Sequence, residues 1–160
     1  MISTEEPKLP VIRESKINHK SGVLHPLARF VTEDTAALLF NLKLEEIYRI
    51  DCWKHVVYVH GKGVSKFVSY ADFPPIVEVT QPTPQDFVRW RKRWRKSLKI
   101  HQAPKFWKTF YTYQFQYAPT ISSFLAYGEL VAVIKQGFST EDLKELRDVY
   151  TRAQCVWNDF

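Results

Sequence analysis

The sequence predicts an α+β fold, in which a short helix and a small antiparallel sheet of three to four strands are followed by three to four helices. Residues 48–70 contain stretches that alternate between apolar and polar side chains, as strands do. Residues 83–100 and 139–157 repeat apolar side chains every three to four positions, as helices do. The length of 160 residues suits one domain with its own core, which we place at residues 23–160.

The overall composition is that of an ordinary soluble globular protein, with 45% hydrophobic and 25% charged residues. Two cysteines, Cys52 and Cys155, are too few and too far apart for a disulfide framework. The most apolar run, residues 124–134, contains Glu129 and is too short to cross a bilayer. We therefore expect a cytoplasmic protein.

The first 22 residues mix proline, serine and charged side chains with few large apolar ones, so we expect residues 1–22 to form a flexible N-terminal arm. Their polar, acidic start predicts neither a secretory signal nor a transit peptide. A short first helix is expected next. Thr32 suits its N-cap, and the apolar residues 36–39 extend it to about Leu42.

A sheet is expected after this helix, where four short runs have the alternation or the composition of strands. Gly61, Lys62 and Gly63 lie between the second and third runs and predict a hairpin turn. Two consecutive prolines precede the fourth run, which we predict to be a short edge or closing strand. The four runs are residues 48–52, 55–60, 64–70 and 76–79.

Residues 83–100 carry the strongest helix signal. Thr83 suits the N-cap, Pro84 the first helical position and Asp86 the acidic position of a capping box. On a helical projection the large apolar side chains share one stripe and the basic ones fan over the remaining surface. The apolar stripe is Phe87, Trp90, Trp94 and Leu98. The basic side chains are Arg89, Arg91, Lys92, Arg93, Arg95, Lys96 and Lys99.

Residues 105–117 allow two interpretations. Aromatic side chains recur at helical spacing from Phe106, but between Tyr111 and Tyr117 they occupy every second position, as in a strand. We predict a helix that starts near Pro104, with most of the rings in the core.

Two helices are expected to complete the chain. Residues 121–135 are mostly apolar and end before Gly137, which suits a C-terminal cap. Ser139 caps the last helix, with Asp142 three residues later.

The helix at 83–100 also concentrates the charge of the protein. Its seven basic residues and one acid give a net charge of +6, equal to the net charge of the whole chain. Such a face is either a solvated surface above a buried tryptophan stripe, a site for phosphates, or a helix lying on an anionic membrane. The arginines favour phosphate, because the guanidinium group binds it bidentately.

We therefore predict a non-catalytic nucleic-acid-binding protein, with DNA or RNA contacted through backbone phosphates. The alternative is an assembly or adaptor protein whose basic helix docks on an acidic protein partner or an anionic membrane surface. A homo-oligomer that shares the tryptophan stripe between subunits stays open. The candidate binding residues are Arg89, Arg91, Lys92, Arg93, Arg95, Lys96, Lys99 and, from the hairpin turn, Lys62.

No motif in the sequence assigns a metal or a cofactor. Cys52, His55 and His60 lack the spacing of a zinc site, so we interpret the histidines as strand-end residues. A metal-dependent nuclease, the second alternative, needs converging carboxylates with a lysine nearby, and Asp51 with Lys54 does not have the spacing of such a pair. We expect no catalytic residues, no metal ligands and no cofactor.

Overall fold

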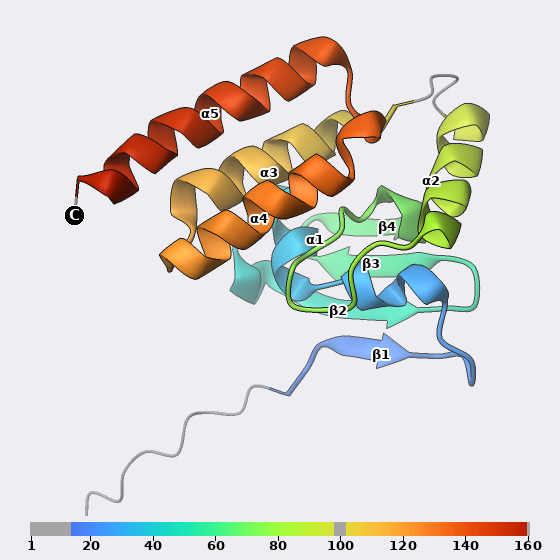
Figure 1. The fold of residues 1–160 in the computed structure, drawn as a ribbon. Helices are drawn as coiled ribbons and strands as arrows, with labels where there is room; N and C mark the ends of the chain where they lie inside the picture. Colours follow the sequence, from blue (N-terminus) through green and yellow to red (C-terminus); the bar gives the residue numbers. More distant parts are fainter. Residues whose placement is uncertain (1–13, 98–101, 160) are drawn as a thin grey trace, which may run out of the picture.

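The computed structural model describes residues 14–97 and 102–159. It shows the predicted α+β fold, a four-stranded sheet followed by helices (Figure 1). Short 3-10 helices lie between the main elements: η1 (Pro26–Phe30), η2 (Leu44–Glu46), η3 (Tyr70–Asp72) and η4 (Lys135–Gly137). The strands are β1 (Ile17–His19), β2 (Ile47–Cys52), β3 (Val57–Gly61) and β4 (Val64–Val68). The α-helices are α1 (Glu33–Leu39), α2 (Pro84–Ser97), α3 (Lys105–Tyr117), α4 (Ile121–Val133) and α5 (Thr140–Asn158).

The sheet has the strand order β1-β2-β3-β4. It contains parallel and antiparallel pairs, whereas the sequence predicted a purely antiparallel sheet. Strands β2, β3 and β4 form the predicted antiparallel meander, but β1 pairs with β2 in parallel, with Ile17 opposite Ile50. A parallel neighbour requires a long crossover, and η1, α1 and η2 lie between the two strands. Residues 17–19, which the sequence assigned to a flexible arm, therefore belong to the sheet, and residues 1–13 of the predicted arm lie outside the described residues.

The hairpin between β3 and β4 is confirmed. Gly61 pairs with Val64, so Lys62 and Gly63 form a two-residue turn, and Gly63 has a φ of 71°. A positive φ is readily adopted by glycine, which explains the residue at this position. The predicted strand at 76–79 is wrong: residues 77–79 form a turn and a bend, and the chain just before them is held by α3, whose Tyr111 hydroxyl donates to the carbonyl oxygen of Pro75.

The aromatic segment 105–117 is a helix, and its buried face consists of Trp107, Phe110, Tyr111 and Phe115. Tyr113 and Tyr117, which shared the helical stripe expected from the sequence, are exposed. The face of α3 that is buried therefore differs from the expected one by a rotation of the helix about its axis. Hydrogen bonds to neighbouring segments hold the helix in this orientation. The hydroxyl of Tyr111 donates to the carbonyl oxygen of Pro75 at 2.7 Å, and the indole nitrogen of Trp107 donates to that of Asp72 at 3.0 Å.

The core is centred on three tryptophans from α2 and α3. Trp107 stands edge-on to both Trp90 and Trp94, with ring centroids 5.3 Å and 5.4 Å apart. All three side chains are fully buried. Gly137 faces the ring of Trp94 so closely that an added Cβ would lie 3.1 Å from it. A side chain at that position would press on the indole ring, because α2 approaches the backbone after α4 there.

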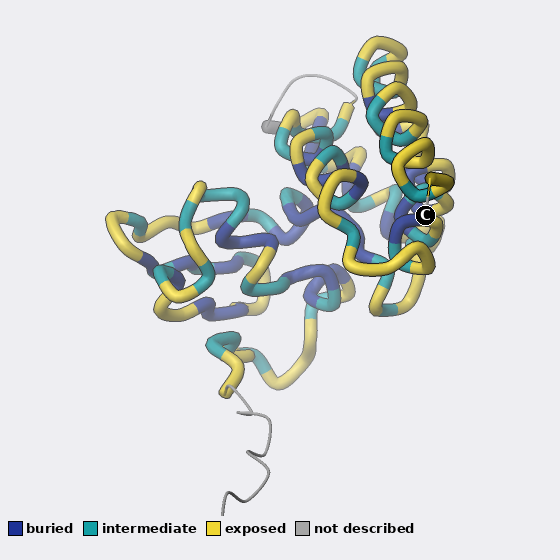
Figure 2. Tube along the Cα trace, turned by 90° about the vertical axis from the view of Figure 1, so that its left-hand side faces the viewer, coloured by how far each residue is buried: buried dark blue, intermediate teal, exposed yellow. Residues whose placement is uncertain are grey.

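The helices lie on one side of the sheet (Figures 1 and 2). The covered face carries buried side chains such as Ile50, Val57 and Val59. The opposite face is exposed, as antiparallel sheets with one solvated face often are. The sheet therefore has one face that contributes to the core and one that is available to solvent.

The tryptophan cluster yields a stability prediction. We expect Trp90→Ala to lower the free energy of unfolding by about 3–5 kcal/mol, because it removes a fully buried indole and leaves a cavity. Val88→Ala on the exposed side of α2 is the matched control and should cost within about 0.5 kcal/mol. Urea denaturation followed by circular dichroism measures both, and equal losses would contradict the proposed role of the cluster.

Candidate functional site

The start of α2 is locked in place by a capping box and an ion pair. The Thr83 hydroxyl accepts from the Asp86 amide at 3.2 Å, and the Asp86 carboxylate accepts from the Thr83 amide at 2.9 Å. The same carboxylate is bound by the guanidinium of Arg29, which also donates to the carbonyl oxygens of Pro26 and Thr80. Arg29 therefore ties η1 (Pro26–Phe30) to the first turn of α2.

The carboxyl group of Asp86 is buried and nevertheless charged. Burial acts against its ionisation, but hydrogen bonds from Arg29 and from the Thr83 amide outweigh this and hold the pKa of Asp86 below its usual value. A buried carboxylate persists only with such partners. The one acidic residue in the sequence of α2 thus serves the attachment of the helix to the fold.

The buried tryptophans of α2 place a row of cations on the opposite side of the helix. Four basic side chains, exposed and at spacings of three and four residues, surround Val88 in a surface hollow of about 660 Å³. We call these four residues the basic stripe: Arg91, Lys92, Arg95 and Lys96.

The basic stripe is not neutralised by the described part of the chain. Within residues 14–97 and 102–159, no carboxylate forms a salt bridge with any of its four members. Arg91 is held by other contacts, since its Nη2 donates to Gln136 Oε1 at 2.9 Å and its guanidinium lies over the ring of Phe87 at 5.5 Å. The stripe is therefore a set of exposed positive charges on a firmly packed helix.

Two further candidates, Arg89 and Arg93, are half-buried and engaged in ion pairs. Arg89 Nη1 lies 3.6 Å from Asp86 Oδ1, and Arg93 Nη2 lies 3.9 Å from Asp72 Oδ2. Burial raises the pKa of Asp72, although Arg93 acts in the opposite direction. These two arginines contribute to the fold and leave less charge for a ligand.

The last two candidates are not part of the described stripe. Lys99 lies outside the described residues. Lys62, in the hairpin, is bound to Glu46 at 3.4 Å. Strand β4 begins after Lys62. The other end of β4 is followed by η3 (Tyr70–Asp72), the 3-10 helix that contacts α2. Lys62 and the contact of α2 with η3 therefore lie at opposite ends of β4, and Lys62 is not among the residues that line the hollow of the basic stripe.

Sequence reasoning missed His25, which the fold brings close to Arg89. Its ring stacks on Tyr70 with centroids 4.2 Å apart, and its Nδ1 accepts from the Leu27 amide at 3.1 Å. The pKa of His25 is lowered, first by burial and to a lesser extent by the positive charge of Arg89 and by the nearby His55. No sequence signal links His25 to Tyr70 and Arg89, which lie far from it in the chain. Their proximity depends on the packing of η1 against η3.

The residues considered for metal binding lie in β2, in β3 and in the segment between these strands. Cys52 is buried opposite Val57, His55 lies in the turn before β3, and Asp51 is covered and bound by Arg49 at 3.0 Å. Among the described residues, no three His, Cys, Asp or Glu side chains gather as metal ligands.

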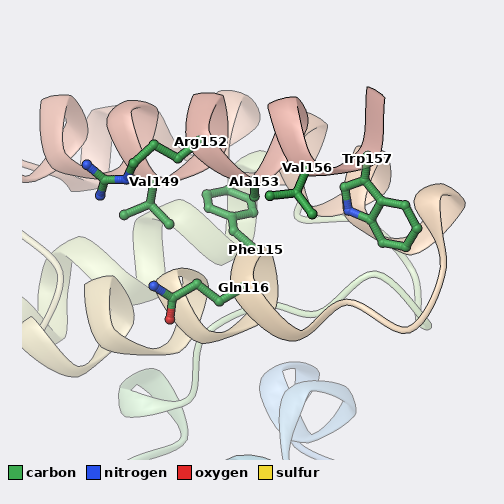
Figure 3. A pocket seen from close by; sticks show the side chains of 7 residues that line it. All are labelled: Phe115, Gln116, Val149, Arg152, Ala153, Val156 and Trp157. Atoms are coloured by element: carbon green, nitrogen blue, oxygen red, sulfur yellow. The ribbon is translucent and has the colours of Figure 1, made fainter. Parts of the chain in front are cut away.

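Helix α5 borders two hollows, one on each side. A cavity of about 310 Å³ lies against α3, where Phe115 points toward Ala153 and Val156 of α5 (Figure 3). A second, of about 630 Å³, lies between α4 and α5, where Tyr150 packs over Gly128. Their walls are largely apolar, and neither adjoins the basic stripe.

The fold and the site together define an α+β protein with a row of exposed cations on one packed helix, which have no carboxylate partner within the described residues. No protein-family model, curated protein or solved structure matches the chain. None of the helices that the structure describes combines the length and the apolar character needed to cross a membrane.

The cap of α2 yields a second prediction. Asp86→Ala removes both the cap and the partner of Arg29, so we expect a loss of about 3 kcal/mol in the free energy of unfolding. Asp86→Asn keeps an acceptor for the Thr83 amide and for Arg29, and should lose less. Urea denaturation at pH 7 compares the two variants. If both variants lost the same free energy of unfolding, the hydrogen bonds of the cap would contribute nothing to stability beyond the charge of Asp86.

His25 yields a pH prediction. Its pKa is lowered in the fold, so the unfolded chain binds the proton more readily, and stability should fall as the pH drops through the unfolded value near 6.5. His25→Asn keeps an acceptor for the Leu27 amide without titrating, and should reduce the stability difference between pH 7.5 and pH 5.5. His19→Asn, at an exposed position of β1, is the control and should retain the wild-type difference.

Proposed function

We propose that the protein is a non-catalytic nucleic-acid-binding protein whose basic stripe contacts backbone phosphates. The observation that carries this proposal is the row of four exposed cations on α2 without a carboxylate partner among the described residues. Like charges so close together repel, and an external polyanion relieves that repulsion while releasing its own counterions.

The geometry of the stripe suits phosphate. Arg91 and Arg95 lie one helical turn apart and offer planar guanidinium groups, which bind phosphate oxygens in pairs. The helix that carries them is held by buried tryptophans, so its backbone loses little freedom on binding. Phosphate contacts of this kind carry no base sequence, and we propose no sequence preference.

A second candidate is an assembly or adaptor role, in which the stripe docks on an acidic protein surface. Val88, 57% exposed among the cations, favours it, because protein interfaces combine apolar centres with charged rims. A membrane-surface role is weaker, because the tryptophans that would enter the lipid are buried in the core.

The test is fluorescence anisotropy with labelled duplex DNA, single-stranded DNA and RNA over a salt series. A variant with Ala at Arg91, Lys92, Arg95 and Lys96 should lose about tenfold or more in affinity. Its slope of log affinity against log salt should also be shallower, by about 0.9 for each phosphate of duplex DNA that the variant no longer neutralises.

The matched control removes the same charge elsewhere, by changing to Ala four exposed cations on α3 and α5: Lys105, Lys144, Arg147 and Arg152. The control should retain most of the affinity. An equal loss in both variants would show that only net charge matters. No binding by the wild-type protein at low salt would refute the proposal and favour a protein partner.

A further inference from the structure

The open face of the sheet is the second distinctive surface of the molecule. Pairing places Tyr58 of β3 opposite Phe67 of β4, and His60 opposite Ser65. On β2, Arg49 lies opposite His60 and Asp51 opposite Tyr58. Since side chains alternate across a strand, all of these point away from the face that carries Val57 and Val59.

Three aromatic side chains of this open face and that of Tyr48, which lies at the irregularity of β2 between Ile47 and Arg49, form two ring pairs. The rings of Tyr58 and Phe67 have centroids 5.1 Å apart, and those of Tyr48 and His60 lie 5.6 Å apart. The Tyr58 hydroxyl also shares a hydrogen bond with that of Ser65. We call these four residues the aromatic platform: Tyr48, Tyr58, His60 and Phe67.

The rings of the platform are oriented by their neighbours and yet remain accessible. Phe67 is 67% exposed and Tyr48 is 52% exposed. Cross-strand aromatic pairs do stabilise sheets, but the solvated face of an antiparallel sheet is ordinarily polar. Large apolar surface that is grouped and exposed commonly marks a binding site.

The charges around the platform are suited to an anion. Arg49 has a side chain that is 53% exposed, whereas the carboxylate of Asp51 beneath it is only 7% exposed and bound by Arg49. Lys62, 70% exposed, lies in the turn that joins β3 and β4, and it pairs with Glu46, whose side chain is 24% exposed. The face therefore presents rings to a ligand beside two cations, Arg49 and Lys62, each of which is more exposed than the carboxylate that it pairs with.

We propose that the aromatic platform stacks on the bases of single-stranded nucleic acid, with Arg49 and Lys62 beside its phosphates. This inference rests on the proposed function and specifies its ligand, because a duplex keeps its base faces stacked inside. Aromatic rings beside cations are a general means of binding single strands, and stacking tolerates any base.

A second copy of the chain is the competing occupant. The free edge of β4 would be its natural docking point, but Lys66 lies there, and charged residues on edge strands oppose pairing between molecules. The open face, not the edge, is therefore the surface that the structure offers. Self-association is kept as an outcome of the test.

The experiment compares a labelled 20-nucleotide oligo(dT) with a labelled 20-base-pair duplex, both at fixed salt. Changing Tyr48 and Phe67 to Ala should weaken oligo(dT) binding about tenfold while leaving duplex binding unchanged. Changing the same two residues to Trp should retain or increase the affinity for oligo(dT). The matched control is Tyr113→Ala with Tyr117→Ala, two exposed rings of α3 that also pack together.

The outcomes separate this inference from the proposed function. Circular dichroism and gel filtration of each variant show whether it is folded and monomeric. Unchanged oligo(dT) affinity in the folded platform variant overturns the inference, even if loss of the basic stripe abolishes binding and so supports the proposed function. The wild-type protein could instead self-associate, and the platform variant could lose this self-association without losing oligo(dT) affinity. That result assigns the open face to a second copy of the chain and also overturns the inference. Absence of binding to either probe by the wild-type protein refutes both.

Discussion

The burial of the apolar stripe of α2 is the interaction on which the rest of the structure depends. Trp90 and Trp94 meet Trp107 edge-to-face, and this contact joins the helix that follows the sheet to the helices at the C-terminal end. Each indole buries a large apolar area, and edge-to-face geometry adds to that stabilisation. Phe30 from η1 also contacts Trp90, so the N-terminal half of the chain joins the same cluster.

Packing of this stripe divides the cations of α2 into two groups. Arg89 and Arg93 lie beside carboxylates and act within the fold, while the basic stripe faces solvent. The attachment of the helix engages Asp86 with Arg29, so this carboxylate does not offset the charge of the exposed stripe. The distinction between structural and available cations comes from the rotation of one helix about its axis.

The two proposed surfaces have complementary chemistry. The basic stripe supplies concentrated charge and few apolar contacts, whereas the aromatic platform supplies rings with modest charge. A single strand presents both phosphates and base faces, so under the two proposals a ligand of that kind would use both surfaces. A duplex, with its bases enclosed, would use only the first.

The sequence by itself determined the features that depend on neighbouring residues: the α+β class, the capping box of α2, the hairpin at Lys62 and Gly63, and the caps of α1 and α5 at Thr32 and Ser139. These follow from local hydrogen bonds and backbone preferences, which a few consecutive residues specify. The exposed character of the basic stripe was predicted by the same local periodicity.

Only the tertiary structure decided the parallel pairing of β1, the buried face of α3, the pairing of Lys62 with Glu46 and the proximity of His25 to Arg89. The aromatic platform belongs to this group, because its ring pairs form across strands. Such contacts join residues distant in the chain, and their energies depend on how whole elements pack. No local pattern encodes that packing, and for this reason they emerge only in the folded molecule.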